Sequence, residues 1–82
     1  MPRRRRGALE TIAVILQSAV EPKIKTELMY DARLAFSGLQ RNLNFLVDLG
    51  LLENNAGLFK TTGKGLRFLQ MYRRVAEMLQ ED

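Results

Sequence analysis

The segment at residues 54–65, NNAGLFKTTGKG, has the residue types of a phosphate-binding loop: glycines, hydroxyls and lysines. A nucleotide-binding P-loop reads G-x-x-x-x-G-K-[ST], in which backbone amides surround the phosphates and the lysine contacts them. Here Gly57 and Gly63 are one residue too far apart, and Lys64 is followed by Gly65 rather than by Ser or Thr. The segment therefore does not fit a P-loop, and the rest of the chain must explain it.

Other kinds of enzyme chemistry also lack their usual residues. The chain contains no His and no Cys, which removes the usual general base, thiolate nucleophiles, zinc sites and disulfides. No pair of carboxylates is in register for acid–base catalysis. The 82 residues also leave no room for the βαβ sheet in which a P-loop sits. We therefore expect no enzyme, no metal and no cofactor.

The length and hydropathy indicate one small domain. The 82 residues, of which 46% are hydrophobic, can bury a single modest core. Charges interrupt every apolar run well short of the ~18 residues that a membrane-spanning helix needs, so no membrane partner is expected. The basic N-terminal run is not followed directly by an apolar stretch, which argues against a secretory signal. The absence of Cys suits an intracellular protein.

The positive charge falls in two separate regions. The four arginines at residues 3–6 equal the whole net charge of +4. Residues 54–76 then contain five basic side chains and no acidic one. A disordered tail or a solvated helix face would explain one such run. Two regions in a chain with a pI of about 10.0 favour a polyanionic partner, with nucleic acid ahead of membrane.

The first half of the chain predicts three helices. Apolar residues recur at helical spacing over residues 8–19, and Pro22 ends that pattern because it pushes the preceding residue out of the α region. A short helix fits residues 26–32. A third helix ends near Gly50, which can supply a left-handed stop. The expected inward residues are, in chain order: Leu9, Ile12, Ala13, Leu16 and Ala19; Leu28, Met29 and Ala32; Phe36, Leu39, Leu43, Leu46 and Val47.

A hairpin and a fourth helix follow. Two short strands at residues 51–53 and 58–60 are joined by residues 54–57, whose Asn and Gly tolerate tight-turn conformations. Such a hairpin must pack against the helices to be stable. Thr62 is a candidate N-cap for a helix to about residue 79. One face of that helix is expected to close the core: Leu66, Leu69, Tyr72, Ala76 and Leu79.

Four segments in this order resemble one family. KTELMYDARL at residues 25–34 resembles the second helix of small archaeal winged helix-turn-helix DNA-binding proteins. The pattern FxxLxxxL at residues 36–43 and DLGLLE at residues 48–53 resemble their recognition helix and first wing strand. Residues 59–69 resemble their second strand and the start of their last helix. The relatives include chromatin-associated proteins and plasmid or viral regulators that dimerise through the last helix.

The resemblance implies a mainly α fold with a small β-hairpin, in the order helix, helix, helix, strand, strand, helix. Residues 1–7 would form a basic N-terminal arm. Residues 8–82 would form a winged-helix domain, whose last helix, at about residues 62–80, would dimerise. The implied function is non-enzymatic binding of double-stranded DNA, as a transcriptional regulator or a chromatin-type architectural protein in the cytoplasm, associated with the nucleoid. A winged helix acting as a protein–protein interaction module in a transcription or repair assembly is the alternative, since Arg41 is the one basic residue of the recognition helix.

The recognition helix of a winged helix enters the major groove. Residues opposite or beside its apolar stripe are the expected base contacts: Ser37, Gln40, Arg41 and Asn44. Arg41 can donate two bonds to guanine, while Asn44 and Gln40 can bridge the two polar atoms of adenine. Alternatively, the arginine and the amides only solvate a surface helix.

Contacts to the DNA backbone are expected from the start of the second helix and from the wing: Lys25, Thr26, Asn54, Asn55, Lys60, Thr61 and Lys64. These contacts position a protein and carry no direct sequence information. Asn54 and Asn55 fit ordinary turn residues equally well. The N-terminal arginines resemble basic arms that lie in a minor groove or along the backbone: Arg3, Arg4, Arg5 and Arg6. A disordered anchor is the other interpretation.

The last helix carries a second apolar face: Phe68, Met71, Val75 and Met78. Two apolar faces predict pairing with the same helix of a second chain, hence a homodimer. A single wide face that covers the first helix is the alternative.

The recognition helix departs from the family pattern at its start. The usual Ser or Thr cap is replaced by Ala35, and Ser37 with Gln40 offers a substitute capping box two residues later, which would begin the helix late. Phe45 falls off the apolar stripe and is expected to be buried under the wing.

Overall fold

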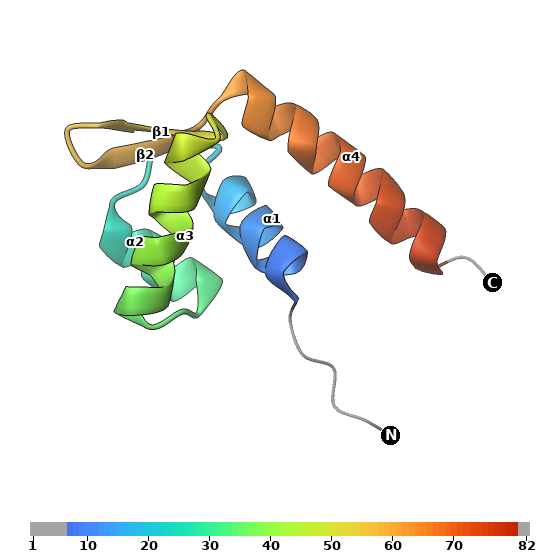
Figure 1. Cartoon of the computed structure of the whole chain (residues 1–82), viewed down its shortest axis with the longest axis horizontal. Helices are drawn as coiled ribbons and strands as arrows, with labels where there is room; N and C mark the ends of the chain where they lie inside the picture. The colour runs from blue at the N-terminus through green and yellow to red at the C-terminus, as the bar shows by residue number, and fades with distance from the viewer. Residues whose placement is uncertain (1–6, 81–82) are drawn as a thin grey trace.

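The computed structural model describes residues 7–80, which form four helices and a two-stranded antiparallel hairpin (Figure 1). The elements are α1 (Ala8–Ser18), α2 (Lys25–Ala32), α3 (Phe36–Asp48), β1 (Leu52–Asn55), β2 (Leu58–Thr61) and α4 (Gly63–Gln80). The predicted order of elements and the mainly α composition are confirmed. Among the described residues, no helix is both long and apolar enough to cross a membrane.

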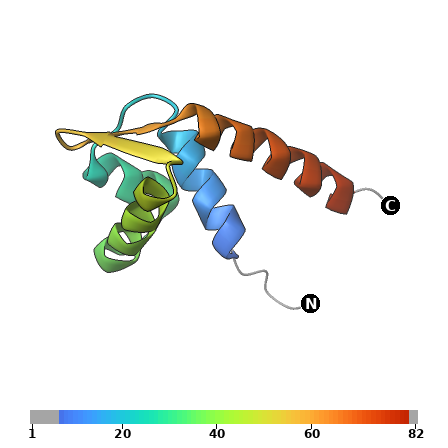
Figure 2. The ribbon, with the colours of Figure 1, turned by 45° about the horizontal axis from the view of Figure 1, so that its top comes forward.

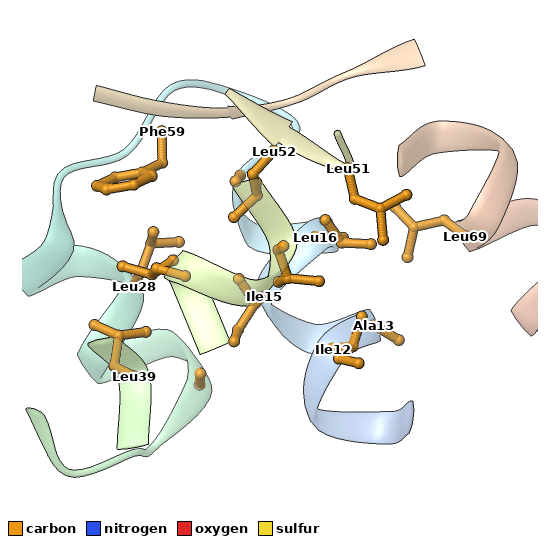
Figure 3. Close-up of a cluster of buried hydrophobic side chains, with 14 residues drawn as sticks. Ile12, Ala13, Ile15, Leu16, Leu28, Leu39, Leu51, Leu52, Phe59 and Leu69 are labelled. Carbon is orange, nitrogen blue, oxygen red and sulfur yellow. The ribbon is translucent and has the colours of Figure 1, made fainter. Parts of the chain in front are cut away.

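The core lies between α1, α2, α3 and the hairpin, where each element contributes its apolar face (Figure 3). The largest fully buried side chains are Ile15, Leu16, Leu28, Leu39, Leu43, Leu46 and Leu52. The predicted inward positions of α2 and α3 at Leu28, Leu39, Leu43 and Leu46 are confirmed. These four leucines recur at helical spacing and meet on one side, which is the physical reason that periodicity located them.

Five predicted burials are wrong, and three of them lie outside α4. Leu9 is 60% exposed because it lies in the first turn of α1, along an open groove beside α4. Phe36 is 58% exposed at the first position of α3. Phe45 is 51% exposed, because it projects about 120° from the line of Leu39 on a helix with 3.6 residues per turn.

The start of α3 does not use the substitute capping box. The helix begins at Phe36 with Ala35 as its N-cap residue and without a side-chain cap bond. The backbone N–H of Leu39 already donates to the carbonyl of Ala35 at 3.0 Å. Because the first helical hydrogen bond already starts at Ala35, Ser37 lies inside the helix and does not cap it. The prediction that the helix begins late is wrong.

Gly50 and the hairpin turn follow the prediction. Gly50 has φ of 78° at the end of α3, and the hairpin turn places Ala56 at φ 53° and Gly57 at φ 90°. β1 begins one residue later than predicted and includes Asn54 and Asn55, so the turn is limited to Ala56 and Gly57. The register pairs Leu52 with Thr61 and Asn55 with Leu58.

The connection between α1 and α2 pairs with the outer side of the hairpin. Lys23 donates its N–H to the Phe59 carbonyl at 2.9 Å and accepts the Phe59 N–H at 2.8 Å. The Thr61 N–H donates to the Ala19 carbonyl at 2.8 Å. The β2 strand is therefore hydrogen-bonded on both edges, which holds the hairpin against the helices.

α4 starts as predicted but then leaves the core. The Thr62 hydroxyl accepts the N–H of Gly65 at 3.1 Å, which confirms the N-cap. Leu69 is the one large side chain of α4 that is fully buried, and Figure 3 shows it directed toward Leu51. Beyond it α4 extends away from the three-helix body (Figure 2). The predicted inward residues Leu66 and Leu79 are 44% and 81% exposed, respectively, because no element covers them.

We predict that Gly65→Ala destabilises the fold by about 1–3 kcal/mol, as overpacking does. A Cβ at position 65 would lie 2.4 Å from the Leu51 carbonyl oxygen and 2.6 Å from the Thr61 methyl carbon, so the backbone must shift. Urea denaturation measures the change. Gly38→Ala is the matched control, because a Cβ there meets nothing within 4 Å and should stabilise α3 by about 0.5–1 kcal/mol. Equal midpoints for Gly65→Ala and the unaltered chain would contradict the close packing.

Candidate nucleic-acid interface

The outward face of α3 carries a row of polar side chains. Ser37, Arg41, Asn44 and Asp48 are all exposed and lie opposite the buried leucines, since 3.6 residues per turn brings them to one side. The guanidinium of Arg41 makes no hydrogen bond or ion pair within residues 7–80. Its five N–H donors are therefore available to an external acceptor.

A chain of side-chain hydrogen bonds lies beside this face. The Lys25 ammonium donates to Gln40 Oε1 at 2.6 Å, and Gln40 Nε2 donates to Asn44 Oδ1 at 3.0 Å. The same ammonium lies 5.7 Å from the centroid of the Phe36 ring. The structure thus brings Lys25, expected to be a backbone contact, together with two expected base contacts. The sequence showed the i to i+4 spacing of Gln40 and Asn44, but no local signal connected them to Lys25.

The exposed face of α2 begins with Thr26, which lies at its second position. Lys60 and Lys64 are also exposed. The Lys60 ammonium donates to the Val20 carbonyl at 3.2 Å, and that of Lys64 donates to the Leu49 carbonyl at 2.7 Å. Each ammonium has three N–H donors, so further donors remain for a phosphate.

The wing asparagines hold the turn. Asn54 Oδ1 accepts the backbone N–H of Gly57 at 2.9 Å, and Asn55 Nδ2 donates to the Glu53 carboxylate at 3.2 Å. Both side chains are exposed. These contacts support the turn interpretation of the two residues.

Thr61 does not face solvent. It is 4% exposed, and its hydroxyl donates to the Leu16 carbonyl at 2.6 Å. Because its only donor is used inside the core, we exclude Thr61 from the set of expected phosphate contacts. The strand period of two was a usable signal, since Phe59 points inward and Thr61 must then do the same.

α3 and the wing enclose a polar groove of about 310 Å³. Its lining residues come from α2, α3 and both strands: Lys25, Gln40, Asn44, Val47, Asp48, Asn54 and Phe59. The groove brings together four of the expected polar contacts: Lys25, Gln40, Asn44 and Asn54. Arg3, Arg4, Arg5 and Arg6 lie outside the described residues.

A second surface lies between α1 and α4. Met71, Val75 and Met78 are 68%, 53% and 68% exposed, respectively, whereas Phe68 is half-buried and stacks on Tyr72 with ring centroids 6.4 Å apart. An apolar groove of about 660 Å³ runs beside these residues to the start of α1. We call this surface the α4 groove.

Comparisons with known proteins agree with this architecture. A family model described as winged helix-turn-helix matches residues 5–80. Among solved structures, the chain is similar to Sso10a-2, a DNA-binding protein from Sulfolobus solfataricus, with a TM-score of 0.71 and 22% sequence identity. The match covers 94% of this chain and 100% of that chain, and at this identity it shows the shared fold alone. The comparison with curated proteins gives no match.

We predict that Thr61→Val lowers the free energy of unfolding by about 1–3 kcal/mol, because the buried Leu16 carbonyl loses its hydroxyl donor. Chemical denaturation followed by circular dichroism measures this loss. Thr26→Val makes the same chemical change at an exposed position and should alter stability little. Comparable destabilisation by the two variants would count against a special role for the Thr61 hydroxyl.

Proposed function

Because the chain belongs to the winged helix-turn-helix family, we propose that it binds double-stranded DNA without catalysing a reaction, with α3 in the major groove. The main support is the exposed polar face of α3, where Arg41 has unused donors. In a winged helix this face meets base edges. That Sso10a-2, which shares the fold, is a DNA-binding protein favours the same partner for this chain.

In this proposal the residues beside α3 bind the phosphate backbone. Lys60 and Lys64 are exposed next to the hairpin, and the N-terminal arginines add a basic arm. The start of α2, beside Thr26, is a further proposed phosphate contact, although the Glu27 carboxylate already accepts the Ile24 N–H there at 3.0 Å. Such contacts make affinity depend strongly on salt and weakly on sequence.

The proposed base contacts distinguish a regulator from an architectural protein. In this proposal Arg41, Asn44 and Ser37 contact base edges, as a transcriptional regulator requires. The four arginines of the arm favour tight general binding, as in a chromatin-type protein. Both roles place the protein at the nucleoid, and selection of binding sites from genomic DNA separates them.

We also propose a homodimer formed through α4. The observation that supports it is the α4 groove: Met71 and Val75 line it and are exposed, and Met78 is exposed next to them at helical spacing. Exposed methionines and valines in contact with water favour association with another apolar face. A symmetric pair would present two α3 helices to successive half-sites of DNA.

We expect steeply salt-dependent binding to a mixed-sequence duplex. Fluorescence anisotropy at about 50 and 200 mM salt gives the slope, which increases by roughly 0.9 for each phosphate neutralised. Arg41→Ala should weaken binding to preferred sequences by about 1–3 kcal/mol. Arg74→Ala removes the same charge from an exposed position on α4 and should change the affinity less. An absence of binding at low salt would reject DNA as the partner and favour the protein-interaction alternative.

We expect sedimentation equilibrium at micromolar concentration to give twice the chain mass of 9.4 kDa. Met71→Asp combined with Val75→Asp should give single chains, because two carboxylates would face the apolar partner surface. Both residues are exposed in the single chain, so circular dichroism should show an intact fold. Gln70→Asp adds a carboxylate beside this face and should leave the dimer intact. A single-chain mass for the unaltered protein would refute the dimer.

A further inference from the structure

The orientation of the Gln40 side chain is decided by Lys25. The two ends of an amide have nearly the same shape, so its hydrogen bonds determine which end points where. An ammonium only donates hydrogen bonds, so the Gln40 atom 2.6 Å from the Lys25 ammonium must be oxygen. The amide nitrogen of Gln40 then points in the other direction along α3.

Gln40 passes this orientation on to Asn44. The Gln40 nitrogen lies 3.0 Å from Asn44 Oδ1, which must therefore act as the acceptor. Because the Asn44 oxygen is used by Gln40, the free end of the exposed Asn44 amide is its NH₂ group. We call Lys25, Gln40 and Asn44 the amide relay.

The Phe36 ring holds Lys25 in place. The ammonium lies 5.7 Å from the ring centroid, within the range of a cation–π interaction. Lys25 is half-buried, although Phe36 is itself largely exposed at the start of α3. The lysine is thereby kept beside α3 instead of extending freely toward a phosphate.

The outward face of α3 consequently consists mainly of donors. Arg41 and the NH₂ group of Asn44 donate, the Ser37 hydroxyl both donates and accepts, and Asp48 at the far end accepts. Guanine presents two acceptors in the major groove, N7 and O6, whereas adenine presents one acceptor and one donor. An asparagine that binds adenine uses both ends of its amide. Gln40 takes one of the two lone pairs of Asn44 Oδ1 and turns that oxygen toward Gln40, so the NH₂ group is the end of Asn44 that is left fully free. Asp48 can accept from the N4 amino group of a cytosine.

We propose that the amide relay makes α3 select G·C over A·T base pairs, with Lys25 as a positioning residue that sets the polarity of Asn44. This inference rests on the proposed DNA binding. It replaces the sequence-based expectation that Gln40 and Asn44 bridge adenine. The ligand class is thus a duplex whose major groove presents guanine N7 and O6 to α3.

The first test compares two duplexes of equal length with the same flanks and either a G·C or an A·T core, by anisotropy at about 50 mM salt. The G·C core should bind about fivefold more tightly or better, the lower end of one good base contact. Replacing its guanines with 7-deazaguanine keeps base pairing but removes the N7 acceptor, and should abolish most of the preference.

Two variants test the relay itself. In Gln40→Glu the carboxylate can only accept, so Asn44 must turn its NH₂ group inward and its oxygen outward. The ratio of G·C to A·T affinities should then fall to about one or reverse. Lys25→Met frees the Gln40 amide and should also lower the ratio. Lys60→Met removes the same charge from the wing and should weaken both duplexes equally, which leaves the ratio unchanged.

The outcomes separate this inference from the function on which it rests. If neither duplex binds, both the proposed DNA binding and the G·C preference are rejected. Binding without a G·C preference, or with an A·T preference, would overturn the inference and leave DNA binding intact. A G·C preference that Gln40→Glu and Lys25→Met both retain would show that the relay does not set it. In that case Lys25→Met would weaken both duplexes equally, as expected for Lys60→Met, and Lys25 would be a contact to the DNA phosphate backbone.

Discussion

The structure depends on the close approach of the first turn of α4 to the chain segment that follows α3. The Leu51 carbonyl accepts the N–H of Thr62 at 3.0 Å, and its oxygen would lie only 2.4 Å from a Cβ at position 65. The Thr62 hydroxyl caps α4 and also donates to the Gly50 carbonyl at 2.6 Å. Thr61, one residue earlier, is bonded to α1. The hairpin, α3, α4 and α1 are therefore all fixed by a few residues around one glycine, and a side chain at that glycine would separate them.

The contacts around Gly65 also determine which face of α3 is exposed to solvent. α1, α2 and the hairpin cover the leucines of α3, so its polar side must face outward. The pairing of Lys23 with Phe59 holds the hairpin beside the start of α2. That placement brings Lys25 to the same groove as Gln40 and Asn44. The polar groove thus results from the packing of the core, because no single element supplies all of its lining.

α4 has two parts, one packed on the core and one proposed to pair with a second chain. Its first turns are anchored by Gly65 and Leu69, whereas the rest extends past the three-helix body (Figure 2). Beyond Leu69, Tyr72 still packs against the core, whereas Met71, Val75, Met78 and Leu79 are exposed. These exposed side chains can therefore pack against a second chain without being withdrawn from the core. DNA binding and dimer formation would use separate surfaces of the chain, but a substitution at Met71 that separates the two chains would also weaken binding to paired half-sites, because it separates the two α3 helices.

The sequence by itself determined the elements and most of their core residues. Pro22, Gly50 and the turn at Gly57 act through local backbone rules, and the leucines of α3 follow one helical period, so neighbours along the chain were sufficient. Tertiary structure alone decided what each remaining side chain meets. Phe36 and Phe45 are apolar but exposed, because no element packs over them. The bond between Lys25 and Gln40 joins residues 15 positions apart, and it exists only because α2 and α3 pack together. Burial and hydrogen-bond partners depend on which elements come into contact, which local sequence patterns do not specify.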